Sequence, residues 1–141
     1  MTIGRLIEGR ESVLTCDVAT TVREAAAMLA KRRIGAMPVM AGGAIAGIFS
    51  ERDVIYRLHE FGASVLDMPV GDVMTAPAVT VEPGTEVMTA LALMTRRRIR
   101  HLPVVEGTRM IGFVSIGDLV KHRIEKVESE AAAMREYIQT A

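Results

Sequence analysis

The stretch Gly47-Ile48-Phe49-Ser50-Glu51-Arg52-Asp53 recurs further along the chain as Gly112-Phe113-Val114-Ser115-Ile116-Gly117-Asp118. Both copies read glycine, two apolar residues, serine, two variable residues and aspartate. The offset between them, 65 residues, also aligns residues 14–55 with residues 79–120 without a gap, and 14 of the 42 aligned pairs are identical. Ordinary composition would give roughly three identical pairs by chance. The chain is therefore an internal duplication.

The duplication sets the expected domain organisation. We expect repeat 1 over residues 1–62, a linker over residues 63–69, repeat 2 over residues 70–125 and a C-terminal helical extension over residues 126–141. A unit of about 60 residues is marginal as an independent domain. We therefore expect one fused domain, in which the repeats bury their helical faces against each other around a pseudo-two-fold axis and form two equivalent clefts.

Each repeat is predicted to be an α/β unit with the order β-α-β-β-α. Apolar residues recur at helical spacing after Thr20 or Thr21, either of which can cap the first helix, and a second helix is expected after each repeated serine. Pro38 and Pro103 indicate an edge or an interruption in the middle strand, because proline has no N–H to donate. The expected strands are residues 13–16, 36–40 and 44–49 in repeat 1, and residues 78–81, 101–105 and 109–114 in repeat 2.

Composition disfavours several functional classes. The 17 basic residues balance 17 acidic residues, which argues against a nucleic-acid or membrane partner. The single cysteine, Cys16, excludes an intrachain disulfide and indicates a cytoplasmic location. No apolar run approaches the roughly 20 residues that span a bilayer. His59, His101 and His122 lack the spacing of metal ligands, and no acid–base pair is found, so neither a metal site nor an enzyme is expected.

The repeated Ser-x-x-Asp string has two interpretations. A serine before a helix, with an acid three residues later, satisfies the free amides of the first turn, and this capping role needs no ligand. The same geometry suits a nucleotide, because a helix N-terminus attracts phosphate and a carboxylate can accept both hydrogen bonds of a ribose diol. Both interpretations remain open at this point.

The repeats resemble cystathionine-β-synthase (CBS) domains, and the pair resembles a Bateman module. The resemblance covers residues 3–125 and rests on the two repeated strings together with Gly71-Asp72-Val73-Met74-Thr75 and Ile99-Arg100-His101-Leu102-Pro103-Val104-Val105. It implies a regulatory module that binds an adenosyl ligand such as AMP, ADP, ATP, NAD or S-adenosylmethionine.

The resemblance also implies the site residues. Asp53 and Asp118 would hold ribose hydroxyls, with Ser50 and Ser115 beside them, and the opposite repeat would supply the pocket for the base. Carried over, the residues facing Ser50 and Asp53 are Val79, Thr80, Val81, Arg100, His101 and Leu102, and those facing Ser115 and Asp118 are Leu14, Thr15, Cys16, Gly35, Ala36 and Met37.

The two copies differ beside the repeated proline, where repeat 2 has Arg100-His101 and repeat 1 has Gly35-Ala36. One arginine side chain can donate hydrogen bonds to two phosphate oxygens at once, so the cleft that holds Arg100 suits a more highly phosphorylated ligand. A hairpin sets the start of its first strand beside the end of its second, so these residues could serve either cleft. Arg52 or Arg33 could reach into the remaining cleft.

The C-terminal helix carries an apolar stripe. Its members step by four, three, four, three and four residues, which is a heptad pattern: Val120, Ile124, Val127, Ala131, Met134 and Ile138. We expect this stripe to pair two copies in a homodimer; a helix folded back on its own domain is the alternative. The leading hypothesis is a nucleotide sensor for an unknown regulated protein. A structural dimerisation module with unoccupied clefts, an S-adenosylmethionine sensor and a fragment of IMP dehydrogenase are the alternatives.

Overall fold

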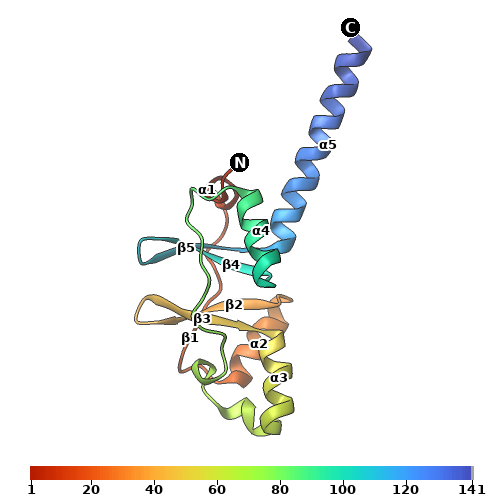
Figure 1. The fold of residues 1–141 in the computed structure, drawn as a ribbon. Coiled ribbons are helices and arrows are strands. Elements are labelled where there is room, and N and C mark those ends of the chain that lie inside the picture. Colours follow the sequence, from red (N-terminus) through yellow and green to blue (C-terminus); the bar gives the residue numbers. More distant parts are fainter. Residues whose placement is uncertain (141) are drawn as a thin grey trace.

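Two short β-sheets meet in the middle of the molecule, one from each repeat (Figure 1). The structure, a computed structural model, describes residues 1–140. In repeat 1 the strand order is β1-β2-β3, and in repeat 2 the hairpin β4-β5 forms the sheet. The strands are β1 (Cys16–Asp17), β2 (Ala36–Ala41), β3 (Ala44–Ser50), β4 (His101–Glu106) and β5 (Arg109–Ser115).

Helices flank the strands in the predicted order. Apolar residues at helical spacing bury one face of each first helix, and Thr21 caps the first of them by accepting the Glu24 amide at 3.2 Å. The helices are α1 (Ile3–Ile7), α2 (Val22–Arg32), α3 (Glu51–Phe61), α4 (Val87–Arg97) and α5 (Ile116–Thr140), with short 3-10 helices η1 (Gly62–Asp67) and η2 (Val70–Asp72). The α/β fold class and the β-α-β-β-α order are confirmed.

The first strand of each repeat is much shorter than predicted. In repeat 1 it is reduced to β1, which pairs in parallel with Val39 and Met40 of β2. In repeat 2 only one bridge forms, between Val81 and Val104. The prediction of strands over residues 13–16 and 78–81 was therefore wrong in extent. Parallel pairing begins only after each middle-strand proline, which cannot donate a ladder hydrogen bond.

Each repeat is completed by the segment that comes just before the other repeat in the chain. The segment before repeat 2 packs on repeat 1, and α1, which comes before repeat 1, packs on repeat 2. The core of repeat 1 includes Val65, Val70 and Val73, so the expected linker is folded and partly buried. The core of repeat 2 includes Ile3 from α1, whose amide donates to the Thr85 carbonyl at 2.8 Å. The N-terminus therefore lies on repeat 2, far from the rest of repeat 1 (Figure 1).

The repeats contact each other through strands, not through helices. Strands β3 and β5 meet across the middle of the molecule, whereas α2 packs on α3 and α4 packs on α5 within each repeat. The expectation that helical faces would bury against each other was wrong. The apolar faces of α2 and α4 are already filled by the sheet and the completing segment of their own repeat.

Helix α5 leaves the domain after its first turns and projects into solvent (Figure 1). Leu119 is buried in the core of repeat 2, but the stripe residues beyond it are exposed, and Met134 and Ile138 are 60% and 66% exposed. The alternative of a helix folded back on its own domain is therefore wrong for the part of α5 that the structure describes. No helix within residues 1–140 is long and apolar enough to cross a membrane.

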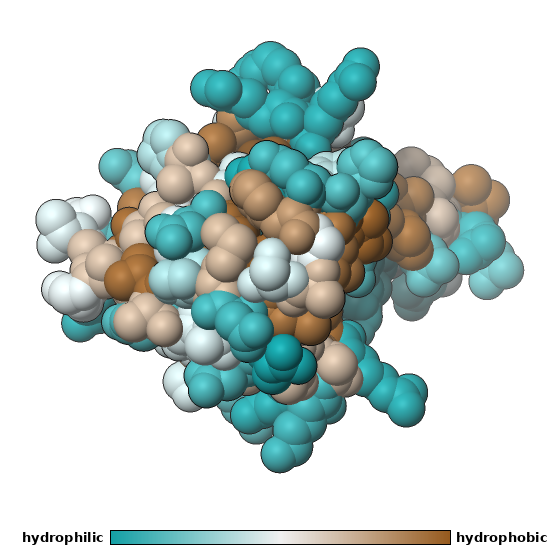
Figure 2. Space-filling model, turned by 90° about the horizontal axis from the view of Figure 1, so that it is seen from below, coloured by the Kyte–Doolittle hydropathy of each residue, from teal (hydrophilic) through white to brown (hydrophobic). Residues whose placement is uncertain are grey.

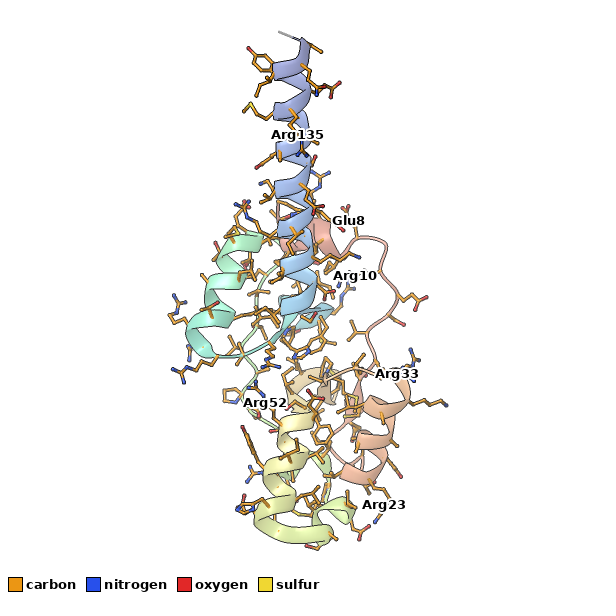
Figure 3. The ribbon with its side chains drawn as sticks, turned by 90° about the vertical axis from the view of Figure 1, so that its right-hand side faces the viewer. Glu8, Arg10, Arg23, Arg33, Arg52 and Arg135 are labelled. Atoms are coloured by element: carbon orange, nitrogen blue, oxygen red, sulfur yellow. The ribbon has the colours of Figure 1, made fainter. Side chains whose placement is uncertain are left out.

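Helix α3 also exposes apolar side chains. Ile55, Tyr56 and Phe61 are all exposed on it. Seen from the repeat 1 end, hydrophobic patches lie among hydrophilic side chains on this surface (Figure 2). Helices α3 and α5 lie on the same side of the sheets and both face the viewer in Figure 3. One side of the molecule therefore carries apolar surface at both ends.

Candidate functional site

Both repeated strings form helix caps. The Ser50 hydroxyl accepts the Asp53 amide at 3.3 Å, and the Asp53 carboxylate accepts the Ser50 amide at 2.9 Å. In repeat 2 the matching distances between Ser115 and Asp118 are 3.1 Å and 2.8 Å. The capping interpretation is confirmed in both copies. Because these contacts use only part of each carboxylate, capping leaves room for a second role.

A hollow of about 330 Å³ opens where repeat 1 faces repeat 2, at the N-terminus of α3. This volume lies in the range of roughly 300–1,000 Å³ that is typical of small-molecule sites. We call it the first cleft. Its polar side includes Ser50, Asp53 and Thr75. Its apolar side is built from Ile48, Pro77, Ala78, Val79 and Ile99, with Tyr56 of α3 at the margin.

Asp53 lies at the polar side of the first cleft with both carboxylate oxygens engaged. Oδ2 takes part in the cap with Ser50, and Oδ1 accepts a hydrogen bond from the Thr75 hydroxyl at 3.0 Å. A hydroxyl partner is easily exchanged for another hydroxyl, because it can rotate to donate elsewhere. Oδ1 of Asp53 is therefore the oxygen that a ligand hydroxyl can reach without breaking the helix cap.

Three arginines surround the first cleft: Arg52, Arg98 and Arg100. Among the ion pairs within residues 1–140, none involves these three side chains. Figure 3 shows Arg52 at the start of α3, at the level where the repeats meet. Glu51 also lines the cleft, so basic groups exceed acidic groups by one when Asp53 is counted. This excess positive charge favours an anionic ligand.

The backbone explains why the arginines of repeat 2 reach this cleft. Arg98 follows α4 with a φ of 55°, in the left-handed region that ends helices. After this turn the chain runs through Arg100 into His101, the first residue of β4, and both residues line the first cleft together with the start of α3. Arg33 ends α2 in the same way, with a φ of 53°, but Arg33 does not line the first cleft.

His101 lies between the two repeated caps. It lines the first cleft, stands opposite Ser115 in the β4–β5 ladder and stacks on Phe113 with ring centroids 5.4 Å apart. Burial lowers the pKa of its imidazole; Asp118 opposes this effect, Arg100 adds to it, and Glu51 opposes it. The lowered pKa keeps the ring neutral near pH 7, which suits an aromatic wall.

The structure gathers some of the expected site residues and separates others. Ser50, Asp53, Val79, Arg100 and His101 line the first cleft together, and so does Arg52. Thr80 is not among the lining residues, and Val81 and Leu102 are buried in the core of repeat 2. Of the residues expected to face Ser115 and Asp118, Gly35 lines the first cleft instead; Cys16 and Met37 lie in the core of repeat 1, Ala36 is buried, and Thr15 lines neither the first cleft nor the hollow beside Arg10.

The clefts are not equivalent, which corrects the expectation from the duplication. The Arg10 guanidinium lies 3.3 Å from Oδ2 of Asp118. A hollow of about 380 Å³ on that side is lined by Arg10, Val13 and Phe113, but neither Ser115 nor Asp118 lines it. Partial burial alone would raise the pKa of Asp118, but the Ser115 amide and Arg10 outweigh it and lower this pKa.

Sequence reasoning missed several lining residues. Thr75 belongs to a stretch that carried the family resemblance, yet its hydroxyl was not assigned to the site. Tyr56 lies three residues after Asp53, which places both on one face of a helix, so helical spacing could have found it. Nothing in the sequence pointed to Arg10, because it lies outside the duplicated segment.

A family comparison agrees with this geometry. The model described as CBS domain matches residues 7–60 and again residues 70–125. The chain belongs to the CBS-domain family. The CBS domain-containing protein CBSX3, mitochondrial, of Arabidopsis thaliana is 39% identical over 133 residues, which cover 91% of this chain and 65% of that protein. Inosine-5'-monophosphate dehydrogenase of Mycobacterium tuberculosis is 34% identical over 111 residues, which cover 77% of this chain and 20% of the enzyme.

Solved structures share the fold of this CBS pair. The CBS-domain containing protein ATU1752 of Agrobacterium tumefaciens is 35% identical, with a TM-score of 0.81 over 86% of this chain and 92% of that chain. CBSX2 in complex with AMP has a TM-score of 0.75 at 24% identity, covering 88% and 96% of the two chains. The CBS pair of MJ0100, solved with 5'-methylthioadenosine and S-adenosyl-L-methionine, has a TM-score of 0.79 at 21% identity, covering 89% and 98%.

Proposed function

We propose that this CBS pair binds an adenine nucleotide (AMP, ADP, ATP or NAD) in the first cleft and acts as a regulatory sensor. The observation that carries the proposal is the first cleft itself. It combines a helix N-terminus, a carboxylate with an exchangeable partner, an apolar wall and three arginines outside any ion pair of residues 1–140. CBSX2, which has the same fold, binds AMP, and this supports the ligand class.

The cleft suggests a binding mode. The ribose diol would donate to Oδ1 of Asp53 in place of the Thr75 hydroxyl. The adenine would lie against the apolar wall formed by Ile48, Val79 and Ile99. The phosphates would lie at the N-terminus of α3, where backbone amides and the nearby arginines attract anions.

The proposal assigns regulation, not catalysis, to the chain. In IMP dehydrogenase the matching segment is a fifth of the enzyme, so most of that enzyme has no counterpart in this chain. Ligand binding would shift the population of two conformations, by as much as its affinity for the two differs. The regulated partner would bind one of these conformations more tightly than the other. The buried thiol of Cys16 supports the proposed cytoplasmic location.

We also propose a homodimer. The exposed stripe on α5 advances in alternating steps of four and three residues, as in a heptad pattern, and suits a second helix lying alongside it. An apolar stripe of this length is unfavourable in water. The exposed apolar side chains of α3, on the same side of the sheets, would enlarge the interface.

A structural dimerisation module is the second candidate. The observation that favours it is that capping by Ser50 and Ser115 accounts for both repeated strings without a ligand. An S-adenosylmethionine sensor is a variant of the first proposal, since MJ0100 shares the fold.

Calorimetric titration with AMP, ADP, ATP, NAD and S-adenosylmethionine separates these candidates. The nucleotide proposal expects binding of at least one of the first four. Binding of S-adenosylmethionine alone would select the variant, and no heat and no melting shift with any of the five would leave only the structural module.

A further inference from the structure

We propose that the Arg10 side chain occupies the second cleft, so that a chain binds one adenosyl ligand, in the first cleft. The second cleft is the region around Ser115 and Asp118. This inference rests on the proposed function and adds the stoichiometry and its cause. The duplication by itself predicts two sites, so the difference must come from residues outside the repeated segment.

The contact of Arg10 is with the carboxylate that a ribose would need. Its Nη1 atom lies 3.3 Å from Oδ2 of Asp118, and the same oxygen accepts the Ser115 amide at 2.8 Å. The Asp118 side chain is 34% exposed and that of Arg10 is 38% exposed, so the ion pair lies at the surface and the guanidinium covers only part of the carboxylate. A ribose diol bound to this carboxylate would have to lie beside the guanidinium on the capping oxygen or displace it.

Pseudo-symmetry shows what stands at the matching place in the first cleft. Ile7 packs against Gly112 as Met74 packs against Gly47, so these two residues correspond. Three residues later the corresponding pair is Arg10 and Pro77. Pro77 lines the first cleft and carries no charge, so nothing at this position competes with a ligand for Asp53.

A second difference narrows the same region. Phe113 in repeat 2 occupies the place that Ile48 occupies in repeat 1, and His101 occupies the place of Ala36. The two rings stack at an interplanar angle of 11°. The hollow beside Arg10 is lined by Phe113 but stops short of Ser115 and Asp118. Arg10 and Phe113 therefore line the hollow on this side, whereas the second carboxylate does not.

The segment that carries Arg10 adds no side chain to the core of either repeat. It joins α1, on repeat 2, to β1, in repeat 1, and residues 8–12 are exposed. The ion pair is itself exposed enough to be weakened by salt. Substitution of Arg10 should therefore remove the guanidinium from Asp118, and ligand binding to the second cleft can then be measured.

The test is calorimetric titration of the full chain with AMP and with adenosine. Wild type is expected to bind one AMP per chain, and Arg10→Ala two. For adenosine, which has no phosphate, Arg10→Ala is expected to tighten the second site by up to about fivefold, the upper range for removal of an exposed ion pair. Arg10→Ala combined with Asp118→Ala should return the stoichiometry to one. Arg23→Ala is the matched control, since it removes another exposed arginine pair, with Asp67 at 3.4 Å, away from both clefts.

The outcomes are distinguishable. Two sites of equal affinity in wild type would overturn the role of Arg10 and uphold the proposed function. A second site that Arg10→Ala weakens for AMP but not for adenosine would make Arg10 a phosphate ligand and overturn the inference. Absence of binding to wild type and to Arg10→Ala would overturn the proposed function together with this inference.

Discussion

A Cβ atom on Gly47 would lie 2.6 Å from the carbonyl oxygen of Thr75. Strand β3 and the segment after η2 are in direct backbone contact here, since the Ile48 and Thr75 amides and carbonyls exchange hydrogen bonds at 2.9 Å. Backbone cannot move aside as a side-chain end can. Glycine at position 47 is therefore required for close packing between repeat 1 and the segment that completes it.

Gly47→Ala should destabilise the protein by about 1–3 kcal/mol, the usual cost of overpacking a core. Gly112→Ala is the matched comparison, because its Cβ would meet the flexible end of Ile7 at 2.7 Å. Denaturant unfolding should show a smaller loss for Gly112→Ala. Equal losses would show that the Thr75 backbone yields as easily as a side chain.

Asp53→Ala should weaken nucleotide binding by roughly 1.5–3 kcal/mol, the cost of losing hydrogen bonds to a charged acceptor. Asp118→Ala removes the same helix-capping group and serves as the control for stability. We expect both variants to melt earlier and only Asp53→Ala to lose affinity for the first cleft, as measured by calorimetry. Normal nucleotide binding by both variants would show that the two aspartates act only as helix-capping groups.

Cys16 should be unreactive in the folded protein. Burial, with a smaller contribution from Asp17, raises the pKa of its thiol from 9.0 to about 11. Two pKa units lower the thiolate fraction at pH 8 by about a hundredfold, and the thiolate is the nucleophile. Iodoacetamide labelling followed by mass spectrometry should show slow modification at pH 8 and rapid modification in denaturant. Equal rates in both conditions would contradict the burial of this side chain.

Truncation after Lys126 should weaken self-association. It removes Val127, Met134 and Ile138, which are exposed on α5, and it leaves Leu119 and the rest of the repeat 2 core in place. Sedimentation of wild type and the truncated chain at matched concentration measures the change, and circular dichroism checks that the repeats stay folded. A monomeric wild type would refute the dimer, and an unchanged dimer would move the interface to the repeats themselves.

The sequence alone determined the fold class, the order of elements and the position of both helix caps. These features depend on local interactions, namely the spacing of apolar residues and the hydrogen bonds between Ser50 and Asp53 and between Ser115 and Asp118. A duplication repeats local interactions faithfully, so both copies could be predicted from one pattern.

Only the tertiary structure decided how the repeats meet and which carboxylate pairs with a guanidinium. Ile3 packs in the core of repeat 2, and Val70 packs in the core of repeat 1. These contacts and the contact between Arg10 and Asp118 join residues that are far apart in the chain. Such contacts depend on the path of the connecting segments, and that path leaves no periodicity in the sequence. The two Ser-x-x-Asp strings therefore look alike in the sequence and differ in their surroundings, because the Arg10 guanidinium, from outside the duplicated segment, lies against Asp118 and not against Asp53.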